Sequence, residues 1–304
     1  MAEEAQIEVK KRGSKRFYGY VCGIVSGMTY GTNPLFGLPL LNDYQMSVDT
    51  VLFYRYASAT ICMFLFCLFR KNMHGVRGDQ WWLLILLGVF FSLSSIFLFT
   101  SYHYIPSGIA TTIIYTEPVI VALLMLALKK YPSWQKWLAI ALSFVGVVFL
   151  CHPNAEAEYH WQGFVLAFLS ALSYAFYLVI VNCSKRIGKI SGSLLSLITL
   201  AVGSVLFFIH SLPEGIAPIP DLKALGLVLG LGLVPTIGSL VTMTYATRMV
   251  GATTTAVLGV MEPVTAICIG VMVFAEPLTA YIIIGFIITV SAITFMTLFD
   301  KKHV

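Results

Sequence analysis

Two glutamates in this sequence stand directly before prolines within otherwise apolar stretches. Glu117-Pro118 lies in the stretch 106–128, and Glu262-Pro263 lies midway along a second stretch. An ionisable group at the middle of a membrane costs about 2.5–3.5 kcal/mol on insertion scales, and such groups usually have a function. A proline inside a helix lacks an N–H group, so a backbone carbonyl loses its partner and the helix kinks. These glutamates could bind protons, bind a cationic group of a substrate, or brace helix ends, and the sequence leaves all three roles open.

Tyr115 stands two residues before Glu117 in the same stretch. On an ideal helix this spacing separates two side chains by about 200°. Both can therefore face one cavity only if Pro118 reorients the turn between them. Tyr115 is a candidate substrate-site residue on that condition.

Other polar and aromatic side chains lie beside prolines or at helical spacing. Pro34 frees the backbone carbonyl of Tyr30, and such a group is tolerated at membrane depth only against protein or water. Tyr174 and Tyr177 are three residues apart and form one aromatic face. Packing is the alternative role for each of these side chains. The candidate substrate and coupling residues are Tyr30, Asn33, Tyr115, Glu117, Tyr174, Tyr177, Thr236, Ser239 and Glu262, and the expected helix kinks are at Pro34, Pro118, Pro235 and Pro263.

The composition places the chain among membrane proteins. It has 304 residues, 58% of them apolar and 11% charged. That charged fraction is less than half of the usual value for soluble domains. An apolar run of about 20 residues is long enough to cross a bilayer as a helix. Ten such helices are expected, at 17–41, 48–69, 80–101, 106–128, 134–151, 161–182, 191–212, 222–246, 251–274 and 278–299.

Basic residues gather in alternate connecting segments. With ten spans, every Lys and Arg except Arg55 and Lys223 falls on one side, and the opposite loops are mainly acidic. The positive-inside rule then places both termini in the cytoplasm. The net charge of +5 is thus a topology signal, and nucleic acid is not an expected partner. We expect a multi-pass protein of the cytoplasmic (inner) membrane.

The two halves of the chain match each other. Tyr30 corresponds to Tyr174 at a shift of 144 residues, and the two Glu-Pro pairs correspond at a shift of 145. Each half has five spans, and because five is odd the second half must be inverted relative to the first. The expected fold is an all-α integral membrane protein with ten transmembrane helices in two inverted five-helix repeats. Its expected parts are a basic N-terminal segment at 1–16, the repeats at 17–151 and 160–299, and a tail at 300–304.

Four glycines, Gly19, Gly23, Gly27 and Gly31, recur every four residues in the first span. This spacing favours a close-packing seam between helices over a binding site. The kinks and polar stripes predict that the first, third, fourth, sixth, eighth and ninth spans line a central cavity. The more uniformly apolar fifth and tenth spans should be peripheral.

Two five-helix repeats, each with a Glu-Pro pair in its fourth helix, resemble the EamA type of the drug/metabolite transporter superfamily. Arg55, near the outer end of the second span, and the turn 275–279 (Ala-Glu-Pro-Leu-Thr) add to this resemblance, which covers residues 17–299. The first half departs from the pattern, because the basic segment 129–133 stands where that family usually has an acidic turn. The resemblance implies a secondary carrier, often an exporter of amino acids or other small metabolites.

The expected function is therefore export of a small solute by alternating access about a site near the middle of the membrane. Proton coupling through the glutamates is our hypothesis. The alternatives are an uncoupled channel or facilitator and a non-transporting receptor or scaffold. No catalytic or phosphate-binding motif stands out, and neither a cofactor nor a metal is expected. The expected partners are a small-molecule substrate and the lipid bilayer, with protons and a second copy of the chain, as a homodimer, left open.

Overall fold

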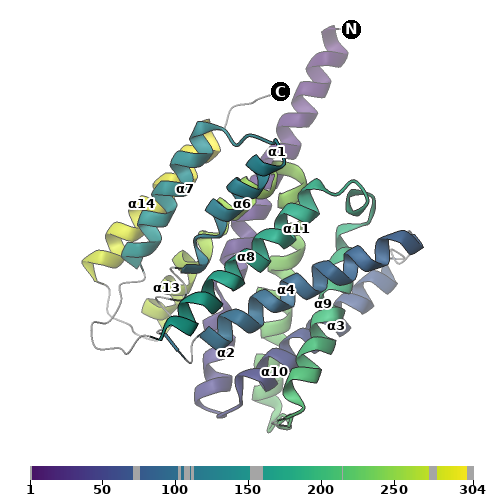
Figure 1. Cartoon of the computed structure of the whole chain (residues 1–304), viewed down its shortest axis with the longest axis vertical. Helices are drawn as coiled ribbons and strands as arrows, with labels where there is room; N and C mark the ends of the chain where they lie inside the picture. The colour runs from purple at the N-terminus through teal and green to yellow at the C-terminus, as the bar shows by residue number, and fades with distance from the viewer. Residues whose placement is uncertain are drawn as a thin grey trace.

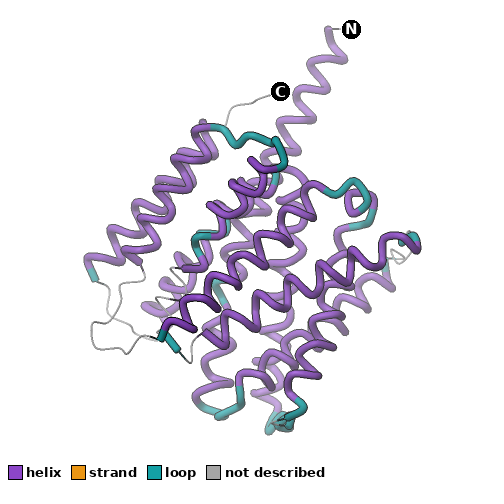
Figure 2. The backbone as a smooth tube through the Cα atoms, viewed as in Figure 1, coloured by secondary structure: helices purple, strands orange, loops and turns teal. Residues whose placement is uncertain are grey.

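The structure is a computed structural model, and it describes residues 2–70, 76–101, 104–105, 110, 113–150, 160–213, 215–273 and 279–299. Over these residues the chain forms helices and loops without strands, as Figure 2 shows. The expectation of an all-α fold is confirmed over this part of the chain. The helices of the first half are α1 Ala2–Tyr30, α2 Asn33–Asn42, α3 Val48–Phe69, α4 Trp81–Ser101, α6 Glu117–Ala127 and α7 Trp134–Leu150. Those of the second half are α8 Trp161–Cys183, α9 Gly192–Ser211, α10 Leu222–Leu231, α11 Ser239–Val250, α12 Ala252–Leu258, α13 Met261–Val273 and α14 Ala280–Phe299.

Within the described residues, six helical segments are long and apolar enough to cross a membrane. The remaining apolar helices, α6, α7 and α14, are shorter by the same measure. The chain is therefore a multi-pass membrane protein. The six segments are Val48–Phe69, Gly78–Ser101, Trp161–Cys183, Gly192–Ser211, Leu222–Val250 and Ala252–Val273.

Several expected spans are interrupted near their middle. The first expected span is divided between α1 and α2, with a break at Gly31 and Thr32. Pro34 lies in the first turn of α2, and Pro118 lies in the first turn of α6. A proline is tolerated there because the first N–H groups of a helix have no partner within it.

The eighth and ninth expected spans are also irregular. Pro235 lies inside a π-helical segment, η3 Gly232–Gly238, which joins α10 to α11 without a break. The ninth span is broken between α12 and α13, and Pro263 lies in the first turn of α13. All four prolines thus lie at or inside irregular segments, and the helix ends they create carry the site described below.

Helices pair across the two halves of the chain. The largest helix contacts are α1 with α11, α4 with α8, α3 with α9, and α7 with α14. In terms of the expected spans, the first span of each half packs on the third span of the other half. The second spans pack on each other, and so do the fifth spans. This is the pairing that a two-fold relation between the halves produces.

The fifth and tenth expected spans, α7 and α14, lie side by side at one flank of the molecule (Figure 1). Helix α1 packs closely in the interior, where its glycines meet the second half of the chain. A Cβ added at Gly23 would lie 2.4 Å from Leu258 Cδ1, and one added at Gly27 would lie 2.8 Å from Met261 Cβ. The glycine run is therefore a seam at which small residues let two helices approach closely.

Candidate functional site

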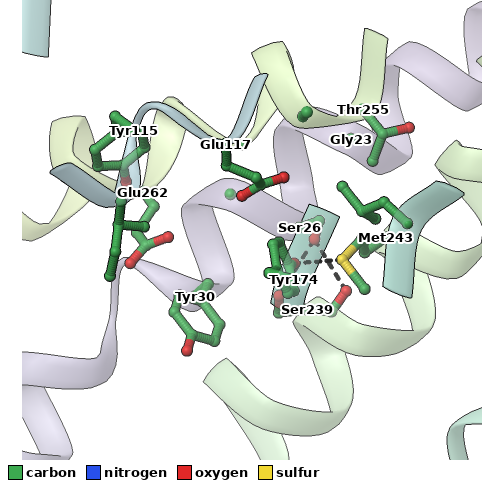
Figure 3. Close-up of a pocket in the computed structure, with 15 residues that line it drawn as sticks. Gly23, Ser26, Tyr30, Tyr115, Glu117, Tyr174, Ser239, Met243, Thr255 and Glu262 are labelled. Atoms are coloured by element: carbon green, nitrogen blue, oxygen red, sulfur yellow. Dashed lines mark hydrogen bonds between the residues drawn. The ribbon is translucent and has the colours of Figure 1, made fainter. Parts of the chain in front are cut away.

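A small pocket, which we call the inner cavity, lies where α1, α6, α8, α11, α12 and α13 meet (Figure 3). Its volume is about 40 Å³, which is room for a few water molecules and too little for a metabolite. Both halves of the chain supply its walls. It is lined by Gly23, Ser26, Gly27, Tyr30, Ile114, Tyr115, Glu117, Tyr174, Leu178, Ser239, Met243, Thr255, Ala256, Gly259 and Glu262.

Glu117 is the first residue of α6 and is only 9% exposed. Its Oε1 atom is buried and accepts no hydrogen bond from any residue that the structure describes. Because α6 begins at Glu117, the carboxylate stands at the N-terminal end of the helix, where the helix dipole favours a negative charge. Glu117 is thus a buried acceptor that has room for a ligand.

Glu262 is the second residue of α13, so it lies in the first turn of its helix, as Glu117 does in α6. Both glutamates are among the residues that line the inner cavity. Two like charges that share so small a space repel each other, and a bound proton or cation would relieve that repulsion. The fold thus brings the two Glu-Pro pairs of the sequence into one site.

Tyr115 and Glu117 line the same cavity although an ideal helix would point them apart. The reason is that the helix is broken between them, at Tyr115 and Thr116. Thr116 stabilises this turn by donating from both its backbone N–H and its Oγ1 to the carbonyl of Ile113, at 2.9 and 2.7 Å. The sequence predicted that Tyr115 and Glu117 can face one cavity only if the turn between them is reoriented. The break before Pro118 reorients that turn.

The two tyrosines of α8 have different surroundings. Tyr174 lines the inner cavity, and its hydroxyl donates to the sulfur of Met243 (Figure 3). Tyr177 is fully buried, and its ring lies 5.3 Å from that of Phe91 between centroids. The two rings stack on each other, 6.3 Å apart between centroids, as the predicted aromatic face requires, but only Tyr174 is among the lining residues of the inner cavity.

Ser239 and Thr236 follow Pro235 but lie in different places. Ser239 lines the inner cavity, and its backbone carbonyl accepts a hydrogen bond of 2.9 Å from Ser26 Oγ. Thr236 is 2% exposed and donates from Oγ1 to the carbonyl of Leu231 at 2.8 Å. Its hydroxyl therefore satisfies the backbone carbonyl of the last residue of α10, and Thr236 is not among the lining residues of the inner cavity.

Asn33 satisfies the carbonyl that Pro34 frees. Its Nδ2 donates to the backbone oxygen of Tyr30 at 2.7 Å. Asn33 lines a second, larger space of about 430 Å³, which we call the outer cavity. The outer cavity is lined by Asn33, Pro34, Gly37, Leu38, Leu41, Val48, Val51, Leu52, Arg55, Phe99, Leu231, Ala266 and Gly270.

The third expected span, α4, contributes Phe99 to the outer cavity and no lining residue to the inner one. The hydroxyls of Ser92 and Ser95 form hydrogen bonds within α4 and with α3. Ser92 donates to the carbonyl of Gly88 at 2.8 Å, and Ser95 shares a hydrogen bond of 2.8 Å with Tyr56. The prediction that α4 lines the central cavity is wrong for the space between the glutamates.

Arg55 was noted in the sequence only as part of the family resemblance, near the outer end of its span, and was not among the candidate site residues. The side chain is 3% exposed, and its Nε donates to Thr236 Oγ1 at 2.7 Å. Its guanidinium carbon lies 5.3 Å from the centre of the Tyr30 ring. One feature of the sequence could have indicated this residue. Arg55 and Lys223 are the two basic residues that do not fall on the side of the membrane where all other Lys and Arg are expected.

Comparison with known proteins identifies the family. The model of the EamA-like transporter family matches residues 17–151 and 161–298. An uncharacterized transporter of Synechocystis is 29% identical over 65% of this chain and 61% of its own length. The uncharacterized transporter YdfC of Bacillus subtilis is 26% identical over 65% of each chain. The chain thus aligns with less than two thirds of the length of these two relatives.

A solved crystal structure shows the same fold. It covers 92% of this chain and 96% of its own chain with a TM-score of 0.77, at 15% sequence identity. A likeness at that identity concerns the fold alone. The two matches of the family model span most of the chain and show that this chain belongs to the EamA-like transporter family.

Proposed function

We propose that the chain is a secondary transporter that exports amino acids or other small metabolites across the cytoplasmic membrane by alternating access. The observation that carries this proposal is the meeting of Glu117 and Glu262 in the inner cavity. They come from corresponding positions of the two halves, and each stands where a helix restarts beside a proline. Broken helices that meet near the repeat interface are typical of secondary transporters.

The proposal includes the full topology, with ten spanning helices in two inverted repeats at 17–151 and 160–299. The cross-pairing of α1 with α11 and of α4 with α8 supports a two-fold relation between the repeats. The start of α1 and the end of α14 lie at the same end of the molecule (Figure 1), as an even number of crossings requires. With the basic segments inside, both termini face the cytoplasm.

The sizes of the two cavities favour a carrier over a channel. The inner cavity, at about 40 Å³, cannot hold a metabolite, whereas the outer cavity is about ten times larger. Tyr30 lines the inner cavity, and Arg55 lines the outer cavity. The guanidinium of Arg55 lies over the ring of Tyr30, so the two cavities are neighbours. An open pore would give one continuous space, but a carrier alternates between states in which a shared site is closed on one side.

Proton coupling is part of the proposal, since two carboxylates line the inner cavity and none of its described lining residues is basic. A proton on one glutamate would remove the repulsion between them. Exchange of that proton for substrate would then link solute export to proton influx.

The direct test is counterflow in liposomes that contain the purified protein. Liposomes preloaded with an unlabelled amino acid should take up the same labelled amino acid faster than empty ones, and the rate should saturate with concentration. A panel of amino acids serves as the probe, and protein-free liposomes are the control. Linear uptake without stimulation from the far side would favour the channel alternative, and no flux of any solute would favour a scaffold.

A further inference from the structure

Arg55 has no role in the transport scheme given so far, yet it is the only buried Lys or Arg among the residues whose burial the structure describes. A buried cation is costly unless it is paired or serves a function. In the described part of the chain, no carboxylate lies within ion-pair distance of its guanidinium. Its printed partners are the hydroxyl of Thr236 and the faces of two aromatic rings, Tyr30 and Tyr56.

These partners hold the guanidinium in place without neutralising it. The hydrogen bond of 2.7 Å occupies Nε. Contacts with the rings of Tyr30 and Tyr56, at 5.3 and 5.9 Å from the guanidinium carbon, stabilise the cation by electrostatic attraction to the ring faces. The two terminal nitrogens form a planar fork that suits a carboxylate. Arg55 is thus an oriented positive charge without an anionic partner in contact.

The position of Arg55 puts this charge between the two cavities. Its side chain lines the outer cavity together with Asn33, whose Oδ1 is buried and accepts no hydrogen bond from the described residues. On its other side lies Tyr30, which lines the inner cavity with Glu262. A solute that passes between the cavities must therefore pass both charges.

We propose that Arg55 is a specificity-determining residue of the transport site, where it binds an anionic group of the substrate while Glu117 and Glu262 bind its amine. This inference rests on the proposed function and narrows it to small zwitterions that carry a carboxylate and an amine. With one proton on the glutamate pair, the three groups have no net charge, which matches a zwitterion. A simple amine would be repelled by Arg55, and a simple acid would be repelled by the glutamates.

The structural alternative is that Arg55 only offsets the field of the glutamates and braces η3 through Thr236. In that case its removal would destabilise the protein without changing which solutes bind. The two readings differ in ligand preference, so the test measures preference and not only activity.

The experiment measures how strongly ligands protect the purified full chain in detergent against heat. The probes are phenylalanine, leucine and methionine, each with its decarboxylated amine and its deaminated acid. At least one amino acid should protect the wild-type protein at a concentration at least tenfold lower than its amine or its acid does. In Arg55→Gln this preference over the amine should fall by on the order of tenfold or more, because an unpaired charged group discriminates strongly. Arg55→Lys keeps the charge and should retain part of the preference.

Lys223→Gln is the matched control, because it removes one exposed basic side chain that lines neither cavity. It should keep the wild-type preference. The inference is overturned if the wild-type protein binds the amine as tightly as the amino acid, if no amino acid of the set binds, or if Arg55→Gln keeps the preference. Should Arg55→Gln fail to fold, the wild-type ligand series and Arg55→Lys decide the matter.

The outcome for the proposed function is separate. Counterflow of amines alone would leave a transporter whose Arg55 is structural. Zwitterion binding that depends on Arg55, with no counterflow of any solute, would support the binding site and reject the carrier.

Discussion

Replacement of Gly31 by alanine tests the contact that connects the glycine seam to the site. Gly31 ends the seam of α1 and lies against the backbone of α13. An added Cβ would lie 2.4 Å from the carbonyl oxygen of Glu262, 2.7 Å from Thr265 Cβ and 3.2 Å from the backbone nitrogen of Ala266. Because the first of these atoms belongs to the backbone, a change of side-chain rotamer cannot relieve the clash.

The expected cost follows from these distances. Ordinary contact with a Cβ begins near 3.4 Å, so α1 and α13 would have to separate by about 1 Å, which loses dispersion contacts along the seam. Overpacking of this kind costs about 1–3 kcal/mol. For a protein of this size, each kcal/mol lowers Tm by about 2–4 °C. The displaced carbonyl belongs to Glu262, so transport should also fall.

The assay is thermal unfolding of the purified variant in detergent, followed by counterflow in liposomes. Gly226→Ala is the control, because Gly226 is an exposed residue inside α10 and an added Cβ there meets nothing within 4 Å. This change should leave Tm unchanged or raise it slightly, since alanine favours a helix by about 0.5–1 kcal/mol over glycine. A Gly31→Ala protein with the Tm of the wild type would refute the close contact of α1 with α13.

Two further predictions concern the topology and the outer loops. After replacement of the native cysteines, Asn154→Cys should react with an impermeant thiol reagent in intact cells and Ser14→Cys should not, and the reverse result would overturn the orientation. Hydrogen bonds from the backbone N–H of Ala224 and from Tyr44 lower the pKa of Asp221 from its ordinary value of 3.8. A lowered pKa contributes stability above that value and loses it as the pH falls through the lowered pKa, so Tm should fall less at acidic pH in Asp221→Asn than in the wild type. Equal acid sensitivity of the two proteins would contradict this role.

The apolar runs predicted most helices well, because a membrane allows few other ways to satisfy the backbone. The runs at 48–69 and 161–182 correspond closely to α3 and α8. The breaks were harder to place. Prolines predicted kinks at their own positions, but the helix ends before Pro34 and Pro118 and restarts with each proline in its first turn. Nor did Pro235 indicate that its helix would continue through a π-helical segment.

For the site, residue type was a better guide than helical spacing. Both glutamates line the inner cavity, and so do Tyr30, Tyr115, Tyr174 and Ser239. Tyr177 does not line this cavity. The helical spacing of the two tyrosines could not show which part of their shared face lies against the cavity and which against the core. Arg55 was missed because its depth depends on the contacts of α3 with η3 and α1, which are between segments far apart in the sequence.

The central claim is that Glu117 and Glu262 couple solute movement to protons within one site. The most direct measurement compares wild-type protein with Glu117→Gln and Glu262→Gln in liposomes, for counterflow and for accumulation driven by a pH gradient. Glutamine keeps the size and the hydrogen-bonding capacity of the side chain but cannot titrate. The account predicts that at least one variant keeps counterflow and loses gradient-driven accumulation. Full gradient-driven accumulation in both variants would contradict it and would leave the glutamates as structural groups of an uncoupled facilitator.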